Sequence, residues 1–163
     1  MTEENTIERL VTLDEKPVEF RTIREKIIQF ENRLKEIPDA FFGDSANCPL
    51  KHAFADGIYV REIFIPKGTS LTGKIHRHSH PNFLMKGDVS VVTEGGGVER
   101  LQAPQSIISK AGTKRVVYAH EDTIWITVHV NFDNGTDLNK IEEFVIAPSY
   151  EDYEQERKLL CPG

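Results

Sequence analysis

Three histidines at alternate positions are the residues whose types and spacing most clearly predict chemistry in this chain. His76, His78 and His80 make up half of the six histidines and lie in one short segment. Side chains two positions apart on an extended strand share one face of the sheet. Neutral imidazole is the commonest metal ligand in proteins. A strand over 74–80 therefore predicts a metal site, and the alternative is an exposed edge strand whose histidines bind nothing.

The elements that would position these histidines are short and mostly extended. Apolar alternation and β-branched residues predict strands over 57–65, 74–80, 82–86, 89–93, 98–102, 106–110, 115–119 and 123–131. The glycine-rich turn from Glu94 to Gly97 predicts a hairpin. Many short strands at regular spacing are typical of a sandwich or a barrel.

A helix is expected on each side of the strands. Residues 20–37 carry apolar side chains at helical spacing, so this helix must pack on the barrel or on a second subunit. Residues 150–160 predict a short acidic helix that Ser149 can cap. We expect a single domain, 1–163, made of an N-terminal extension (1–45), a barrel (46–133) and a C-terminal extension (134–163).

The glycines and histidines together resemble the first motif of the cupin family. Pro66 and Gly68, then the histidine cluster, then Gly87 at the start of the next strand follow that motif, which runs glycine, His-x-His, glutamate, glycine. His80 stands seven residues before Gly87, where the family usually has its glutamate. In the second motif, Arg115 stands in place of the family's histidine.

The rest of the resemblance concerns fold and assembly. Lys110 replaces the second motif's proline, and the run from His52 to His129 is similar to uncharacterised cupin-like proteins of bacteriophages. The resemblance implies a mainly β fold, a single cupin barrel (a double-stranded β-helix of jelly-roll type) with an N-terminal helix and a short C-terminal helix. It also implies a homodimer, since cupins commonly dimerise and the barrel's edge strands need cover.

The same register suggests the metal ligands. His76 and His80 are the best placed, and a third ligand must replace the missing second-motif histidine. A hairpin between the last two strands would bring His129 to that place, whereas the reverse orientation of its strand would put it on the surface. We expect His78 to substitute for one of the three or to be a fourth ligand.

Three histidines without a carboxylate suit one divalent transition metal per chain. Zinc, iron, nickel, copper and manganese are candidates, whereas magnesium and calcium prefer oxygen ligands. Whether His52 or Glu62 joins the ligand set stays open, because His52 also fits a loop and Glu62 a solvated face. His120 is expected to be exposed in a turn.

Five further residues are candidates for binding a substrate beside the metal: Tyr59, Arg61, Asn82, Arg115 and Trp125. A planar guanidinium can clamp a carboxylate or a phosphate. An amide that orients the ligand and an aromatic wall complete the usual mixture of a small-molecule pocket. The alternative for each arginine is a surface salt bridge.

Composition argues against several classes of protein. A chain of 163 residues with net charge −6 and no basic stripe argues against nucleic-acid binding. No apolar run approaches the ~20 residues of a membrane span. The acidic N-terminal residues are unlike a secretory signal, and two distant cysteines make a weak disulfide framework. We expect a cytoplasmic protein, in the host cytoplasm if a bacteriophage encodes it.

Three functional hypotheses follow. The favoured one is a metal-binding cupin that binds a small polar or anionic molecule, for which metal-dependent catalysis of isomerase, lyase or dioxygenase type is open and not established. The second is a cupin that sequesters its ligand without turnover. The third is a structural or interaction scaffold whose histidines are incidental. No acid–base residue is evident beside the histidines, so the sequence leaves catalysis itself undecided.

Overall fold

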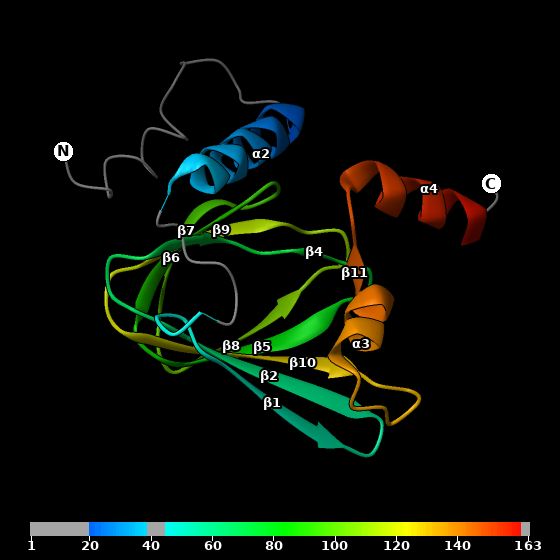
Figure 1. The fold of residues 1–163 in the computed structure, drawn as a ribbon. Helices are drawn as coiled ribbons and strands as arrows, with labels where there is room; N and C mark the ends of the chain where they lie inside the picture. The colour runs from blue at the N-terminus through cyan, green and yellow to red at the C-terminus, as the bar shows by residue number, and fades with distance from the viewer. Residues whose placement is uncertain (1–19, 39–44, 161–163) are drawn as a thin grey trace.

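The computed structural model describes residues 20–38 and 45–160, which form three helices and eleven strands (Figure 1). The helices are α2 (Phe20–Glu36), α3 (Leu138–Val145) and α4 (Tyr150–Leu160). The strands are β1 (Leu50–Ala55), β2 (Ile58–Ile65), β3 (Ser70–Thr72), β4 (Ile75–His76), β5 (His80–Lys86), β6 (Asp88–Thr93), β7 (Gly97–Gln102), β8 (Gln105–Ser109), β9 (Arg115–Ala119), β10 (Thr123–Val130) and β11 (Ile146–Ala147). No helix within these ranges is long and apolar enough to span a membrane.

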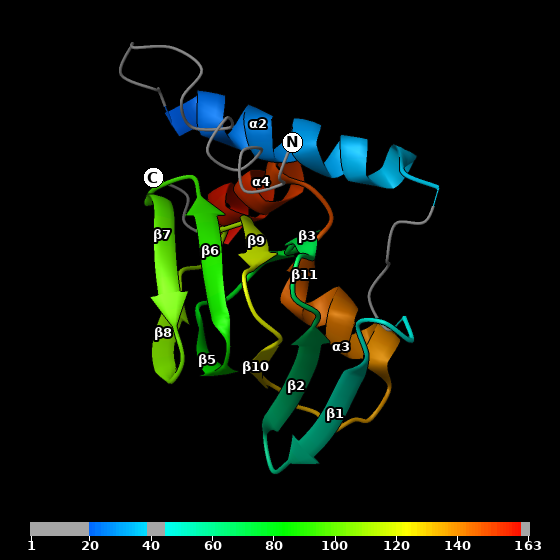
Figure 2. The same cartoon turned by 90° about the vertical axis from the view of Figure 1, so that its left-hand side faces the viewer.

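Two antiparallel sheets enclose the core. Their strand orders are β1-β2-β10-β5-β8 and β3-β9-β6-β7, and β11 pairs with β4 in a small third sheet. Most strands that follow one another in the chain, such as β5 and β6, lie in different sheets, so the chain winds around the core (Figure 2). This arrangement is a double-stranded β-helix. The predicted fold, with a helix before and after the barrel, is confirmed.

One expected pairing is wrong, because β9 and β10 do not form a hairpin. β9 pairs with β3 and β6, and β10 pairs with β2 and β5. The residues between them turn a corner of the barrel: the amide of His120 donates to the carbonyl of Asp88 (2.8 Å), and Asp122 accepts from the amide of Lys67 (2.9 Å). A short polar turn between two β-branched strands fits a hairpin or a corner equally well, and long-range packing decides between them. The hairpin predicted at Glu94 to Gly97 joins β6 and β7, as expected.

The core lies between the two sheets, and a glycine sets one of its corners. Eight buried side chains fill it: Ile65, Leu84, Val89, Val91, Leu101, Val117, Ala119 and Trp125. Gly87, the glycine of the first motif, has φ +102° where the chain leaves β5 for β6. A Cβ there would lie 2.3 Å from Oγ1 and 2.9 Å from Cα of Thr123, so only glycine allows this close approach.

The N-terminal helix packs on its own barrel. Ile27 and Phe30 of α2 are buried against Val92 and Val116, on the outer face of the four-stranded sheet (Figure 1). The helix was expected to pack either on the barrel or on a second subunit, and it packs on the barrel.

The C-terminal extension returns to the barrel. The ring of Tyr153 in α4 packs so closely on Gly112 that a Cβ there would lie 2.3 Å from it. Arg24 of α2 donates to Glu154 of α4 across 2.5 Å, which joins the two extensions. The sequence did not predict β1, β3, α3 or β11, because these elements are short or lack a clear apolar period.

Candidate metal centre

Three histidines from three strands converge inside the barrel. His76 ends β4, His80 begins β5, and His129 lies on the inner face of β10. Their ring centroids are 4.2 Å (His76–His80), 4.6 Å (His80–His129) and 5.0 Å (His76–His129) apart. Their ligating nitrogens all lie within 4.8 Å of one another. Tetrahedral ligation at about 2.1 Å needs nitrogens about 3.4 Å apart, so this group fits a metal after small side-chain movements.

The alternating pattern of β10 explains how His129 reaches this place. Thr123, Trp125, Thr127 and His129 are all buried, whereas the aliphatic residues between them are more exposed. The opposite orientation, with His129 on the surface, is not observed.

Burial keeps the three imidazoles neutral. His80 is 4 % and His129 is 7 % exposed. Burial, followed by the charges of the neighbouring histidines, lowers the pKa of His76 to about 2 and that of His129 to about 3. Burial also lowers the pKa of His80. At neutral pH each ring therefore keeps a free nitrogen lone pair, which is the form that binds a metal.

His78 lies apart from this group. The expected continuous strand over 74–80 is interrupted, since β4 ends at His76 and the chain bends before β5 begins at His80. The bend breaks the two-residue alternation, so His78 is exposed and its ring packs against Phe144 of α3, 5.1 Å away.

The C-terminal extension holds the bend in place. Ile146 of β11 pairs with His76, and the amide of Arg77 donates to the carbonyl of Val145 (2.8 Å). The Arg77 guanidinium donates to the carbonyl of Ile146 and forms a two-pronged ion pair with Glu156 (2.9 Å for each bond). Sequence reasoning missed this support, because a two-residue strand has no detectable period.

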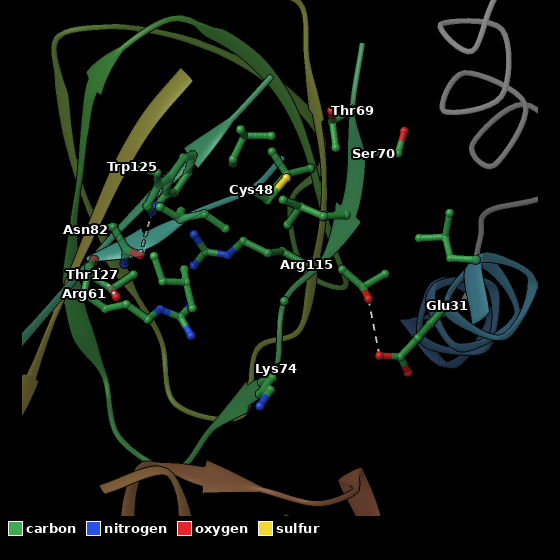
Figure 3. A pocket seen from close by; sticks show the side chains of 18 of the residues that line it. Glu31, Cys48, Arg61, Thr69, Ser70, Lys74, Asn82, Arg115, Trp125 and Thr127 are labelled. Atoms are coloured by element: carbon green, nitrogen blue, oxygen red, sulfur yellow. Dashed lines mark hydrogen bonds between the residues drawn. The ribbon is translucent and has the colours of Figure 1, made fainter. Parts of the chain in front are cut away.

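A cavity of about 470 Å³ lies beside the histidines. Figure 3 shows other side chains of its wall, among them Arg61 and Arg115. His76 and His80 line it, so they face both the metal position and the cavity. Four of the predicted substrate-binding residues line it too: Arg61, Asn82, Arg115 and Trp125.

The fifth predicted substrate-binding residue, Tyr59, does not line the cavity. Its ring stacks on His129 with centroids 6.0 Å apart, and its hydroxyl lies 2.7 Å from Nδ1 of His52. His52 is on β1, and Glu62 forms an ion pair with Lys51 (2.8 Å). Neither residue joins the histidine group.

A hydrogen-bonded chain connects the histidine strand to Arg115. Trp125 Nε1 donates to Asn82 Oδ1 (3.0 Å), and Asn82 Nδ2 donates to Ser109 Oγ (2.7 Å) and to the carbonyl of His80 (3.2 Å). Arg115 also donates to Ser109 Oγ. Because the indole N–H is only a donor, it fixes which side of the Asn82 amide faces Ser109. Sequence reasoning missed Ser109, since its position opposite His80 depends on the pairing of β5 with β8.

The two arginines have no carboxylate partner among the described residues. Burial lowers the pKa of Arg115 to about 10, so its guanidinium remains charged at neutral pH, and it lies 5.4 Å from the Trp125 ring centroid. Nε of Arg61 is buried without a hydrogen-bond partner. Glu31, an acid that lines the cavity, is already bonded to Lys114 (2.8 Å). A chain of net charge −6 thus has a locally positive cavity.

No model of a protein family matches the sequence, and no curated protein matches it. Solved structures with a similar fold include an RmlC-like cupin with a double-stranded β-helix from Methanocaldococcus jannaschii, 10 % identical, covering 56 % of this chain and 87 % of that one with a TM-score of 0.45. Ectoine synthase from P. lautus is 16 % identical (58 % and 72 % covered, TM-score 0.47). An acetylacetone dioxygenase from Acinetobacter johnsonii is 18 % identical (58 % and 65 % covered, TM-score 0.44). The likeness to these proteins is one of fold.

By its strand pairing the chain is a double-stranded β-helix barrel. Inside the barrel, three histidines that fit a metal lie beside a cavity lined by two guanidinium groups.

Proposed function

We propose that the protein is a metal-binding cupin that holds one divalent transition metal per chain and binds a small anionic molecule. The observation that carries this proposal is the convergence of three neutral, largely buried imidazoles, His76, His80 and His129. They lie beside two guanidiniums that no carboxylate of residues 20–38 or 45–160 pairs with. Burying unpaired charge is costly, so a site that keeps two arginines in this state is suited to an incoming anion.

The ligand set suggests the metal and its open side. Three nitrogen ligands suit zinc, iron, nickel, copper or manganese. His76 and His80 line the cavity and His129 does not, which supports an open coordination position facing the cavity. A bound metal would supply Lewis-acid or oxygen chemistry there. Arg61 and Arg115 would orient the anion, and Asn82, fixed by Trp125, would keep Ser109 and Arg115 in place.

The residues around the cavity favour one type of reaction. Isomerases and lyases move a proton to or from carbon and commonly use a protein acid or base. The acid that lines this cavity, Glu31, is engaged by Lys114. Oxygen insertion of the dioxygenase type makes the smallest demand on protein acid–base groups. The same observation also suits a cupin that binds its ligand without turnover, and mass analysis of each bound ligand after incubation in air separates the two.

Elemental analysis of the purified protein tests the proposal. We expect one equivalent of a transition metal per chain in the wild type and in the surface variant His78→Ala. The double variant His76→Ala/His80→Ala should retain less than about a tenth of an equivalent, because a single remaining imidazole binds too weakly. Unchanged metal content in that double variant would reject the assignment.

We also propose a homodimer formed through the outer face of the five-stranded sheet. Phe83, Met85 and Ile108 are exposed there by 36 %, 54 % and 66 %, and none of the three described helices covers that face (Figure 1). A face five strands wide and about six residues long spans about 24 by 20 Å. Side chains that project from the sheet add to this area, so the accessible surface of the face approaches the ~800 Å² that each partner buries in a standard interface. Light scattering at micromolar concentration should give twice the chain mass, and Ile108→Glu should give the monomer.

A further inference from the structure

The cavity changes from polar to apolar along its length. Strand pairing arranges the inner-face residues of β2, β5 and β10 in successive layers. Starting from the histidine end, the layers are His129 with Tyr59, then Thr127 with Arg61 and Asn82, then Trp125 with Ile63 and Leu84. The charged and amide groups thus lie next to the metal position, and the apolar groups lie one layer further away.

The opposite wall repeats this order. On β9, Arg115 precedes Val117 by two residues, so both face the interior, and Val117 pairs with Leu71 of β3. The backbone of Arg115 bonds to the amide of Gly73 (2.8 Å), close to the β4 histidine. The guanidiniums of Arg61 and Arg115 both point into the cavity (Figure 3).

The apolar part of the cavity extends to the N-terminal helix. Its wall includes Leu34, Ile37, Leu50, Ile63, Leu71 and Val117. Leu34 belongs to α2, and Ile37 is the first residue after that helix. Glu31 of α2 is bonded to Lys114 (2.8 Å) and Thr72 (3.3 Å). The N-terminal extension therefore contributes one end of the cavity.

We propose that the ligand is an amphipathic acid. Its anionic group lies between the metal position and the guanidiniums of Arg61 and Arg115, and its apolar body lies along Ile63, Leu71 and Val117 toward α2. This inference rests on the proposed function, because it concerns the ligand of the same cavity. A fully hydrophilic anion would leave the apolar wall in contact with water, and a neutral apolar ligand would leave both guanidiniums without a counterion. A volume of about 470 Å³ is within the usual range for small-molecule sites.

Calorimetric titration of the zinc-loaded protein tests this inference, since zinc is redox-inert and allows binding without turnover. Acetate, butanoate, hexanoate and octanoate keep one head group and lengthen the apolar body. We expect affinity to rise roughly tenfold for each two-carbon step until the cavity is filled, from the transfer free energy of a methylene group. Equal affinity for all four acids would overturn the inference that the ligand has an apolar body. Hexan-1-ol should bind at least tenfold more weakly than hexanoate, and equal binding would overturn the inference that the ligand carries an anionic group.

Variants locate the two ends of the ligand. Arg115→Met should lower hexanoate affinity at least tenfold and leave that of hexan-1-ol unchanged, whereas Arg33→Met, at an exposed position on α2, should change neither. Ile37→Ser should weaken octanoate several-fold and leave acetate unchanged. If Arg115→Met loses no hexanoate affinity, the anion lies elsewhere and the inference is wrong.

Two further measurements distinguish the chemistry of the head group and the role of the metal. Hexyl phosphate binding more tightly than hexanoate would identify a phosphate head group, and the reverse order a carboxylate. If the wild type takes up no zinc, the proposed metal function fails. The same titrations on the metal-free protein then still decide whether the ligand is an amphipathic acid, because the arginines and the apolar wall do not depend on the metal.

Discussion

Lowering the pH should destabilise the metal-free protein through its buried histidines. Burial lowers the pKa of His76 to about 2 and that of His129 to about 3 in the folded chain, whereas an unfolded histidine titrates near ~6.5. Below pH ~6.5 the unfolded chain therefore binds protons that the folded chain does not. By linkage, the free energy of unfolding is highest above pH ~6.5 and falls steadily as the pH drops from there toward the folded pKa values.

The magnitude follows from these values. Each histidine that stays neutral in the folded state contributes a loss of RT ln(1 + 10^(6.5−5)), about 2 kcal/mol, between pH 8 and pH 5. His76 and His129 together give about 4 kcal/mol, and His80 acts in the same direction. Because pH 5 is well above both folded pKa values, the result does not depend on their exact size. Unfolded carboxylates titrate near pH ~4 and contribute only about 0.1 kcal/mol each over this interval.

Urea unfolding with a chelator at pH 8, 7, 6 and 5 measures this loss. Trp125 is the only tryptophan and is 5 % exposed, so its fluorescence reports the core. His129→Gln should reduce the loss between pH 8 and pH 5 by about 2 kcal/mol, whereas His78→Gln, at a surface position, should leave it unchanged. A wild-type loss below about 1 kcal/mol, or the same loss in His129→Gln, would refute the reasoning.

Three further predictions concern the supports of the site. Arg77→Met removes the bonds that fix the bend after His76. The metal affinity proposed for the site, measured by chelator competition, should then fall about 10- to 100-fold while the unfolding midpoint changes little, and unchanged affinity would show that β11 alone suffices. Gly87→Ala places a Cβ against Thr123 at φ +102°, so urea unfolding should show a loss of about 2–4 kcal/mol, and a loss below ~0.5 kcal/mol would contradict the close approach. Asn82→Leu leaves the Trp125 N–H without its partner and should cost about 1–3 kcal/mol in the same assay, with a wild-type midpoint as the contrary result.

Local pattern predicted most elements of this fold. The strand that carries Trp125 and His129 alternates buried and more exposed residues, and its observed range, Thr123–Val130 (β10), differs by one residue from the predicted range. The helix expected over 20–37 is observed as Phe20–Glu36. Such elements are predictable because the face that each residue occupies depends on the period of its own segment.

Pairing between strands was less predictable. The expected hairpin of β9 with β10 is a crossover between sheets, and β11 pairs with β4, about 70 residues away in the chain. No local period records which partner a strand chooses, since the choice depends on how the whole set of apolar faces can be buried together.

In the candidate site, too, some features follow from the local sequence and others only from the tertiary structure. The sequence by itself determined that histidines and arginines of the right types lie on strands that a barrel can bring together. Tertiary structure alone decided that His80 and His76 converge with His129 while His78 points to α3, because the bend at Arg77 is fixed by contacts with the C-terminal extension. Likewise, only the packing of two sheets and α2 decided that Arg115 faces the cavity with no carboxylate partner in the described part of the chain, since burial and charge pairing are properties of the assembled fold.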